Sequence, residues 1–206
     1  MTEVNAVLDA GADVIHFDVM DGRFVETLSF GLPVLEAVAA ATSLPIDAHM
    51  MVHEPARFAE SYAAAGATMM TVHVEACADL PATIDSIRAA GMTPAVSLNP
   101  RTPLESIEAS LAQVARVLVM TVIPGKGGQS FMREVLPKLQ QLAALRDERG
   151  LELEIAVDGG IKAGTAGEAV QAGAEVLVSG TGIFRHPDGV AAGAAALRSA
   201  AAGVRA

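Results

Sequence analysis

The sequence predicts an α/β fold, a barrel of parallel strands and covering helices that lacks its first strand. Seven short apolar segments recur along the 206 residues, with a helix-length segment between each pair. Five of them follow a glycine that closes a helical stretch, and glycine ends helices readily because it tolerates a left-handed backbone. Continuous apolar strands that alternate with helices are typical of a parallel sheet.

The predicted elements begin with a helix over residues 2–10, and no strand precedes it. A closed barrel normally has eight βα units, so we expect the first strand to be missing and residues 1–206 to form a single domain. The alternative is an open, doubly wound sheet, but no early glycine-rich nucleotide turn supports it. The predicted strands cover residues 14–18, 44–49, 69–72, 93–98, 116–120, 153–157 and 176–178.

The composition excludes several classes of function. A net charge of −10 with no basic cluster argues against nucleic acid and anionic membranes as partners. No apolar run reaches the roughly 18 residues of a membrane span, and nothing at the N-terminus resembles a secretory signal. Cys77 is the only cysteine, which fits a reducing, cytoplasmic location. A phosphorylated substrate stays compatible with this charge, because backbone amides at a helix N-terminus can hold one phosphate.

Polar residues collect where the predicted strands end, which is the face that carries the chemistry of parallel barrels. His16 and Asp18 end one strand, His49 ends the next, and Asp158 ends a later one. If the strands form a ring, all four side chains reach one central space. Imidazole and carboxylate together suit a divalent zinc, manganese, iron or cobalt ion. The alternative is four separate structural polar residues. His73, followed by Glu75, either lines the mouth of the barrel or supports a strand end.

Three glycine-rich turns follow the later strands, in residues 124–130, 158–160 and 180–182. Bare backbone amides at such turns bind phosphate well, and barrels often hold a phosphate on the loops after their last strands. The turns therefore predict a phosphate site, with flexible turns of no further role as the alternative.

The sequence resembles the ribulose-phosphate 3-epimerase family over nearly its whole length. The motifs that carry the resemblance are HFDVMDG at 16–22, DAHMMV at 47–52, NPRTP at 99–103, VMTVIPG at 119–125, GGQSF at 127–131 and VDGGI at 157–161.

The resemblance implies a (β/α)₈ TIM barrel, an isomerase that interconverts D-ribulose 5-phosphate and D-xylulose 5-phosphate in the pentose phosphate pathway. It implies a cis-enediolate stabilised by one divalent metal ion, with Asp18 as the proton acceptor and Asp158 as the donor on the opposite face. It also implies a homo-oligomer, either a dimer or a hexamer. The implied metal ligands are His16, Asp18, His49 and Asp158; the implied substrate-binding residues are His49, Gly127, Gly128, Gln129, Ser130, Asp158, Gly159, Gly160, Gly180 and Thr181; and Met20, Met51 and Met120 line the pocket.

Two departures from the family pattern bear on this assignment. The family begins with a strand that is absent here, so the start is misplaced or the chain is a truncated, non-catalytic remnant. Lys126 stands where phenylalanine is common, over the substrate, and either adds charge near the phosphate or is solvated. Two further candidate functions are a related epimerase acting on allulose 6-phosphate and a metal-free phosphate-binding isomerase.

Overall fold

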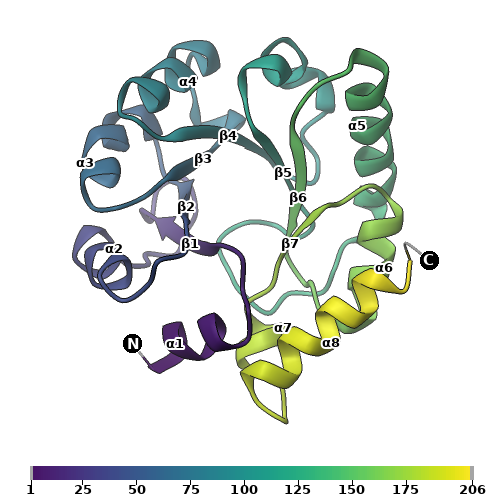
Figure 1. Ribbon diagram of the computed structural model, residues 1–206. Coiled ribbons are helices and arrows are strands. Elements are labelled where there is room, and N and C mark those ends of the chain that lie inside the picture. The colour runs from purple at the N-terminus through teal and green to yellow at the C-terminus, as the bar shows by residue number, and fades with distance from the viewer. Residues whose placement is uncertain (1, 205–206) are drawn as a thin grey trace.

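The fold is built on one sheet of seven parallel strands, seen in a computed structural model that describes residues 2–204 (Figure 1). The strands lie side by side in chain order, and the predicted strand segments are confirmed to within about two residues at either end. The strands are β1 (Ile15–Met20), β2 (Ile46–Met51), β3 (Met69–His73), β4 (Thr93–Leu98), β5 (Arg116–Met120), β6 (Glu154–Asp158) and β7 (Val176–Val178).

The sheet curls around a central axis and carries its helices on the outside (Figure 1). Within residues 2–204, β1 and β7 are the two edges and each pairs with one neighbour only. The predicted seven-stranded barrel is therefore confirmed. The terminal helices pack against each other on this side, where the Arg198 guanidinium donates a 2.7 Å hydrogen bond to the Ala10 carbonyl oxygen.

The helices follow the strands in the alternation that the sequence predicts, with one exception described below. They are α1 (Thr2–Asp9), α2 (Leu32–Ala39), α3 (Ala59–Ala64), α4 (Leu80–Ala89), α5 (Leu136–Arg149), α6 (Ala163–Gln171), α7 (Thr181–Phe184) and α8 (Val190–Ala202). Short 3₁₀ helices connect them: η1 (Pro55–Phe58), η2 (Val74–Ala76), η3 (Leu104–Ser106), η4 (Glu108–Gln113) and η5 (Arg133–Val135).

The connection between β4 and β5 departs from the expected α-helix, since the structure places η3 and η4 there. Pro103 begins this segment, and its carbonyl oxygen accepts bonds from the backbone N–H of Ser106 at 3.2 Å and the Ser106 hydroxyl at 2.7 Å. An α-helix would offer that oxygen to residue 107 instead. Local side-chain bonding of this kind competes with the α-helical ladder, which explains the tighter turns.

Alternation along the strands sorts side chains into two layers, because successive residues point to opposite faces. On β5, Val117 and Val119 point outward into the large core beneath the helices, where Leu139 of α5 is also buried. Leu118 and Met120 point inward and pack in a separate small cluster inside the barrel. The same rule turns alternate residues of every strand toward the interior.

Among the described residues, no helix combines the length and the apolar character needed to cross a membrane.

The left-handed glycines that close the helices offer a matched pair for testing the packing. Gly150 has φ +60° and a Cβ there would meet nothing within 4 Å. Gly173 has φ +110° and a Cβ there would lie 2.7 Å from the Ala143 Cβ. We predict that Gly150→Ala lowers the free energy of unfolding by about 1 kcal/mol and that Gly173→Ala lowers it by roughly 1–3 kcal/mol more, because only the second also overpacks the α5–α6 contact. Urea titration measures both, and equal losses would contradict this packing.

Candidate active site

Four predicted side chains meet inside the barrel. His16 and Asp18 come from β1, His49 from β2 and Asp158 from β6. Asp18 pairs in register with His49, which places the two side chains next to each other on the inner face. One potential ligand atom from each of the four lies within 4.8 Å of the others. The structure therefore brings together the whole set that the strand ends predict.

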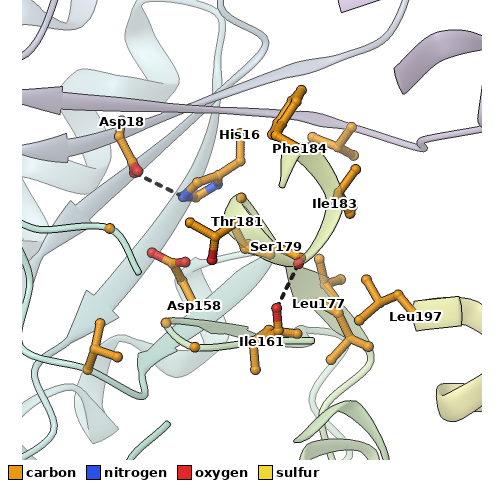
Figure 2. A pocket seen from close by; sticks show the side chains of 18 of the residues that line it. His16, Asp18, Asp158, Ile161, Leu177, Ser179, Thr181, Ile183, Phe184 and Leu197 are labelled. Atoms are coloured by element: carbon orange, nitrogen blue, oxygen red, sulfur yellow. Dashed lines mark hydrogen bonds and ion pairs between the residues drawn. The ribbon is translucent and has the colours of Figure 1, made fainter. Parts of the chain in front are cut away.

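His16 is oriented by a residue at the back of its ring. Its Nδ1 lies 3.2 Å from Oδ2 of Asp47, and its Nε2 lies 3.5 Å from Oδ1 of Asp18 (Figure 2 shows the His16–Asp18 contact). Among the described residues, the buried Nε2 atom has no hydrogen-bond partner. When Nδ1 donates to Asp47 and the ring is neutral, the lone pair of Nε2 points into the space between the carboxylates.

His49 lies between two further residues. Its Nδ1 is 2.9 Å from Oδ1 of Asp18, and its Nε2 is 2.9 Å from Nε2 of His73. His73 is fully buried, and its Nδ1 faces Oε2 of Glu75 at 3.3 Å. Of the two roles considered for His73, the structure places it behind His49, as a support and away from the mouth.

The two aspartates differ in acidity. Desolvation raises the pKa of Asp18, but the hydrogen bond with His49 and the charges of the neighbouring histidines lower it overall. Desolvation and the charge of Asp18 raise the pKa of Asp158 to about 7. Near neutral pH, Asp18 is therefore ionised while Asp158 retains a proton much of the time. Two carboxyl groups whose environments push their pKa values apart are suited to act as base and acid.

The histidines also differ. Burial lowers the pKa of His16, but the hydrogen bond to Asp47 and the charges of the surrounding aspartates raise it to about 9. Burial and the neighbouring imidazoles lower the pKa of His49 to about 4, against the opposing effect of Asp18. The cluster thus concentrates negative charge and attracts a cation. When no other cation is bound, a proton on His16 takes that place.

The same residues fit a divalent metal ion. Ligands about 2.1 Å from a common ion lie at most about 4.2 Å apart, so four atoms within 4.8 Å need only slight closure. The unpartnered Nε2 of His16 would gain a bond on metal binding. Asp47 behind His16 is the carboxylate partner that metal-bound histidines commonly have. Two imidazoles and two carboxylates suit zinc, iron, manganese or cobalt.

A cavity of about 670 Å³ opens beside this cluster and runs along the barrel interior. Asp18 and Asp158 project into it from different strands (Figure 2). Ser130 is exposed and does not line the cavity, and Lys126 lines it with an exposed side chain. The other predicted pocket residues that line it are Met20, Met51, Met120, Gly127, Gly128, Gln129, Gly159, Gly160, Gly180 and Thr181.

Sequence reasoning assigned no role to several residues that support the site. Asp47 holds His16 and also accepts hydrogen bonds from Thr71 at 2.7 Å and from Arg116 at 3.3 Å. The Ser29 hydroxyl donates to the Asp18 carbonyl oxygen at 2.9 Å and accepts from the Met20 N–H. Asp47 could have been found, because it lies two residues before His49 and shares its face. Ser29 and Arg116 gave no such local signal.

Comparisons with known proteins show the family of this chain. The sequence matches the ribulose-phosphate 3 epimerase family over residues 1–184. The chain belongs to that family. It is 44% identical to the ribulose-phosphate 3-epimerase of Bacillus subtilis (strain 168), over 90% of this chain and 86% of the relative. It is 44% identical to the Synechocystis ribulose-phosphate 3-epimerase, over 90% of this chain and 82% of that protein.

A solved structure shares the fold at much lower identity. The 3-hexulose-6-phosphate synthase of Salmonella typhimurium superposes with a TM-score of 0.72 at 19% identity, over 99% of this chain and 92% of that one. The epimerase family membership therefore comes from the sequence relatives, while this likeness extends the barrel architecture beyond the family.

Cys77 provides a test of the packing behind the cluster. Its Sγ donates to the His73 carbonyl oxygen at 3.2 Å, and burial together with the charge of Glu75 raises the pKa of the thiol to about 11. We predict that iodoacetamide alkylates the folded protein at pH 8 at least about 100-fold more slowly than the urea-unfolded protein, since only the thiolate reacts. The rate should climb with pH up to about 11. Equal rates in the two states would contradict this environment.

Proposed function

We propose that this chain is a ribulose-phosphate 3-epimerase, which interconverts D-ribulose 5-phosphate and D-xylulose 5-phosphate. The observation that carries the proposal is the pair Asp18 and Asp158, two carboxyl groups of opposite acidity that face one cavity from different strands. Inversion at a carbon next to a ketone needs a proton removed on one face and returned on the other. Two carboxyl groups in opposite protonation states meet that requirement.

Asp18 is the base of the reaction in the ribulose-to-xylulose direction. Its lowered pKa keeps it ionised, so it accepts the proton from C3 of the substrate and an enediolate forms. Asp158, whose pKa is raised to about 7, donates its proton to the opposite face of C3. In the reverse direction the two residues exchange roles. The methionines Met20, Met51 and Met120 add a polarisable wall that neither donates nor accepts these protons.

His16, His49 and the two aspartates would hold one divalent cation beside the reacting carbon. A bound cation of this kind acts as a Lewis acid that neutralises the negative charge of the substrate oxygens as it develops. The histidines then serve only as ligands, because Asp47 and His73 occupy their other ring nitrogens.

The phosphate end of the substrate is assigned to the glycine-rich turns at the mouth of the cavity. Gly127 and Gly128 follow β5, Gly159 and Gly160 follow β6, and Gly180 precedes α7. Their backbone amides can approach an anion closely because no side chain intervenes. The net charge of −10 makes such local binding by amides more suitable than a general positive surface.

Two alternative functions predict different results in activity assays. A longer ketose phosphate such as allulose 6-phosphate would use the same acid, base and ligands, so the rates on the two substrates separate these epimerases. A non-catalytic remnant would bind metal but show no turnover when residues 1–206 are assayed. The two relatives named above both carry the ribulose-phosphate name, which favours the first assignment. Homo-oligomerisation stays a prediction, and a measurement of molecular mass in solution tests it.

Replacement of either aspartate tests the assignment of acid and base. We predict that Asp18→Asn and Asp158→Asn each lower kcat by at least about 100-fold, because an amide neither accepts nor donates the proton at C3. A coupled assay of xylulose 5-phosphate formation measures the rates. Asp85→Asn is the matched control: Asp85 forms a surface ion pair with Arg88 and should leave the rate unchanged. Near-wild-type turnover in either site variant would remove the proposed acid–base pair.

Removal of metal tests the ligand assignment. We expect dialysis against a chelator to abolish epimerase activity and addition of Zn²⁺, Mn²⁺, Fe²⁺ or Co²⁺ to restore it, since the charge that develops on the substrate oxygens would otherwise lack a counter-charge. Circular dichroism on the same samples checks that the fold persists. Activity that is insensitive to chelation would favour a metal-free isomerase.

A further inference from the structure

A line of hydrogen-bonding groups, which we call the relay, runs from Asp18 in the metal-binding cluster to Glu75, just after β3. Asp18 Oδ1 lies 2.9 Å from His49 Nδ1, His49 Nε2 lies 2.9 Å from His73 Nε2, and His73 Nδ1 lies 3.3 Å from Glu75 Oε2. His49 and His73 are both fully buried, so water does not supply alternative partners from the surface. Each group in this line therefore depends on the next for its hydrogen bond.

The direction of the line follows from its last member. A neutral imidazole carries one N–H group and one lone pair, and an ionised carboxylate only accepts. Glu75 lies well on the ionised side at neutral pH, because its hydrogen bonds outweigh the effect of burial and lower its pKa to about 2. His73 must then donate from Nδ1 to Glu75, which leaves a lone pair on its Nε2. A neutral His49 that donates from Nε2 to that lone pair has no hydrogen on its own Nδ1, as metal binding at Nδ1 requires.

The free lone pair on His49 Nδ1 faces an ionised acceptor, Oδ1 of Asp18, at 2.9 Å. Two acceptors at that distance repel unless a cation lies between them. A metal ion held by these two residues would satisfy the arrangement. Without a metal ion, the opposite direction has His49 donate from Nδ1 to Asp18, which is the hydrogen bond that lowers the pKa of Asp18. This direction turns a ring lone pair of His73 toward the Glu75 carboxylate and blocks Nδ1 as a ligand, so Glu75 opposes it.

Glu75 is itself held firmly in place. Its other oxygen, Oε1, accepts from the backbone N–H of Asn99 at 2.8 Å and from the Thr102 hydroxyl. The Lys138 ammonium donates to the carbonyl oxygens of Asn99, Pro100 and Thr102 at 3.0, 2.8 and 2.6 Å. These contacts tie the turn after β4 to Glu75. Both carboxylate oxygens are therefore used as acceptors, which an amide in the same place could not reproduce.

We propose that Glu75 and His73 are positioning residues that fix the tautomer of His49, so that a lone pair on Nδ1 is presented to the metal. Asp47 plays the corresponding part for His16 through a direct contact with its Nδ1. His49 turns Nδ1 toward the metal site, whereas His16 turns Nε2 toward it. The carboxylate that supports His49 therefore acts through a second imidazole, that of His73. This inference rests on the proposed metal centre, and it adds two residues that touch neither the metal nor the substrate.

The wild-type protein gives the first test, with Zn²⁺ as the probe. Protein labelled with ¹⁵N at histidine and loaded with one equivalent of Zn²⁺ is examined by long-range ¹H–¹⁵N correlation spectroscopy, which reports which ring nitrogen carries hydrogen. We expect hydrogen on Nδ1 of His73 and on Nε2 of His49. Hydrogen on Nε2 of His73 in the zinc-loaded protein would overturn the relay, and this test needs no variant to fold.

Variants give the second test, in which Zn²⁺ affinity is measured by competition with a chromophoric chelator. Glu75→Gln and His73→Phe should each weaken Zn²⁺ binding by about 10–100-fold, the usual effect of losing a partner behind a metal ligand. Glu105→Gln is the matched control: Glu105 is exposed in the same loop region and takes no part in the relay, so its affinity should stay within about twofold of wild type.

The double variant separates the relay from a simple loss of negative charge. If the two residues act in series, Glu75→Gln causes little further loss of Zn²⁺ affinity once His73→Phe has broken the line. If Glu75 acts only through its charge, the two losses of affinity add in full. Additive losses, or single variants that match the Glu105→Gln control, would overturn the relay while wild-type Zn²⁺ binding left the proposed metal centre standing. Failure of the wild-type protein to bind Zn²⁺ would overturn the metal centre and the relay together.

Discussion

The buried ion pair between Arg116 and Asp47 is the interaction on which the site depends. Asp47 is 1% exposed, and a carboxylate so deep in the barrel is stable only with its charge compensated. Arg116 lies 3.3 Å away and is itself paired with Glu154 at 2.7 Å nearer the surface. With its charge balanced, Asp47 can hold His16 from behind. Removing one partner of such a pair typically costs about 3–5 kcal/mol, because the other charge stays buried alone.

Charge compensation also explains why the two catalytic candidates differ. Asp18 has His49 at hydrogen-bond distance and is further stabilised as an anion by the neighbouring imidazoles. Within residues 2–204, Asp158 receives no comparable side-chain hydrogen bond, and it faces the charge of Asp18, so its neutral form is favoured. The acid–base asymmetry thus arises from unequal partners around two chemically identical groups, as it does wherever environment separates paired carboxyl groups.

The strand that carries two of the four candidate ligands is an edge strand within residues 2–204. β1 pairs with β2 only, yet His16 and Asp18 are held on it by contacts that cross to other elements. His16 reaches Asp47 on β2, and Ser29 bonds the backbone of Asp18 and Met20 at the end of the strand. These cross-links position the ligands without a second paired neighbour, beside a cavity of about 670 Å³ that extends between β1 and β7.

The sequence by itself determined the strand order, the four side chains that cluster inside the barrel, and the family. Those features are local: apolar runs define strands, alternation in a strand defines faces, and His16, Asp18, His49 and Asp158 stand at strand ends. The prediction of an α-helix between β4 and β5 was wrong, because the hydrogen bonds of Ser106 favour 3₁₀ turns there.

Only the tertiary structure decided which residues support the ligands. Asp47 and Arg116 are separated by 69 positions, and Glu75 and Thr102 by 27, so no local pattern connects them. The acidity of Asp158 likewise depends on burial and on a charge brought from β1. Hydrogen-bond direction, desolvation and charge pairing act over a few ångströms in space, and the fold alone decides which residues share that space.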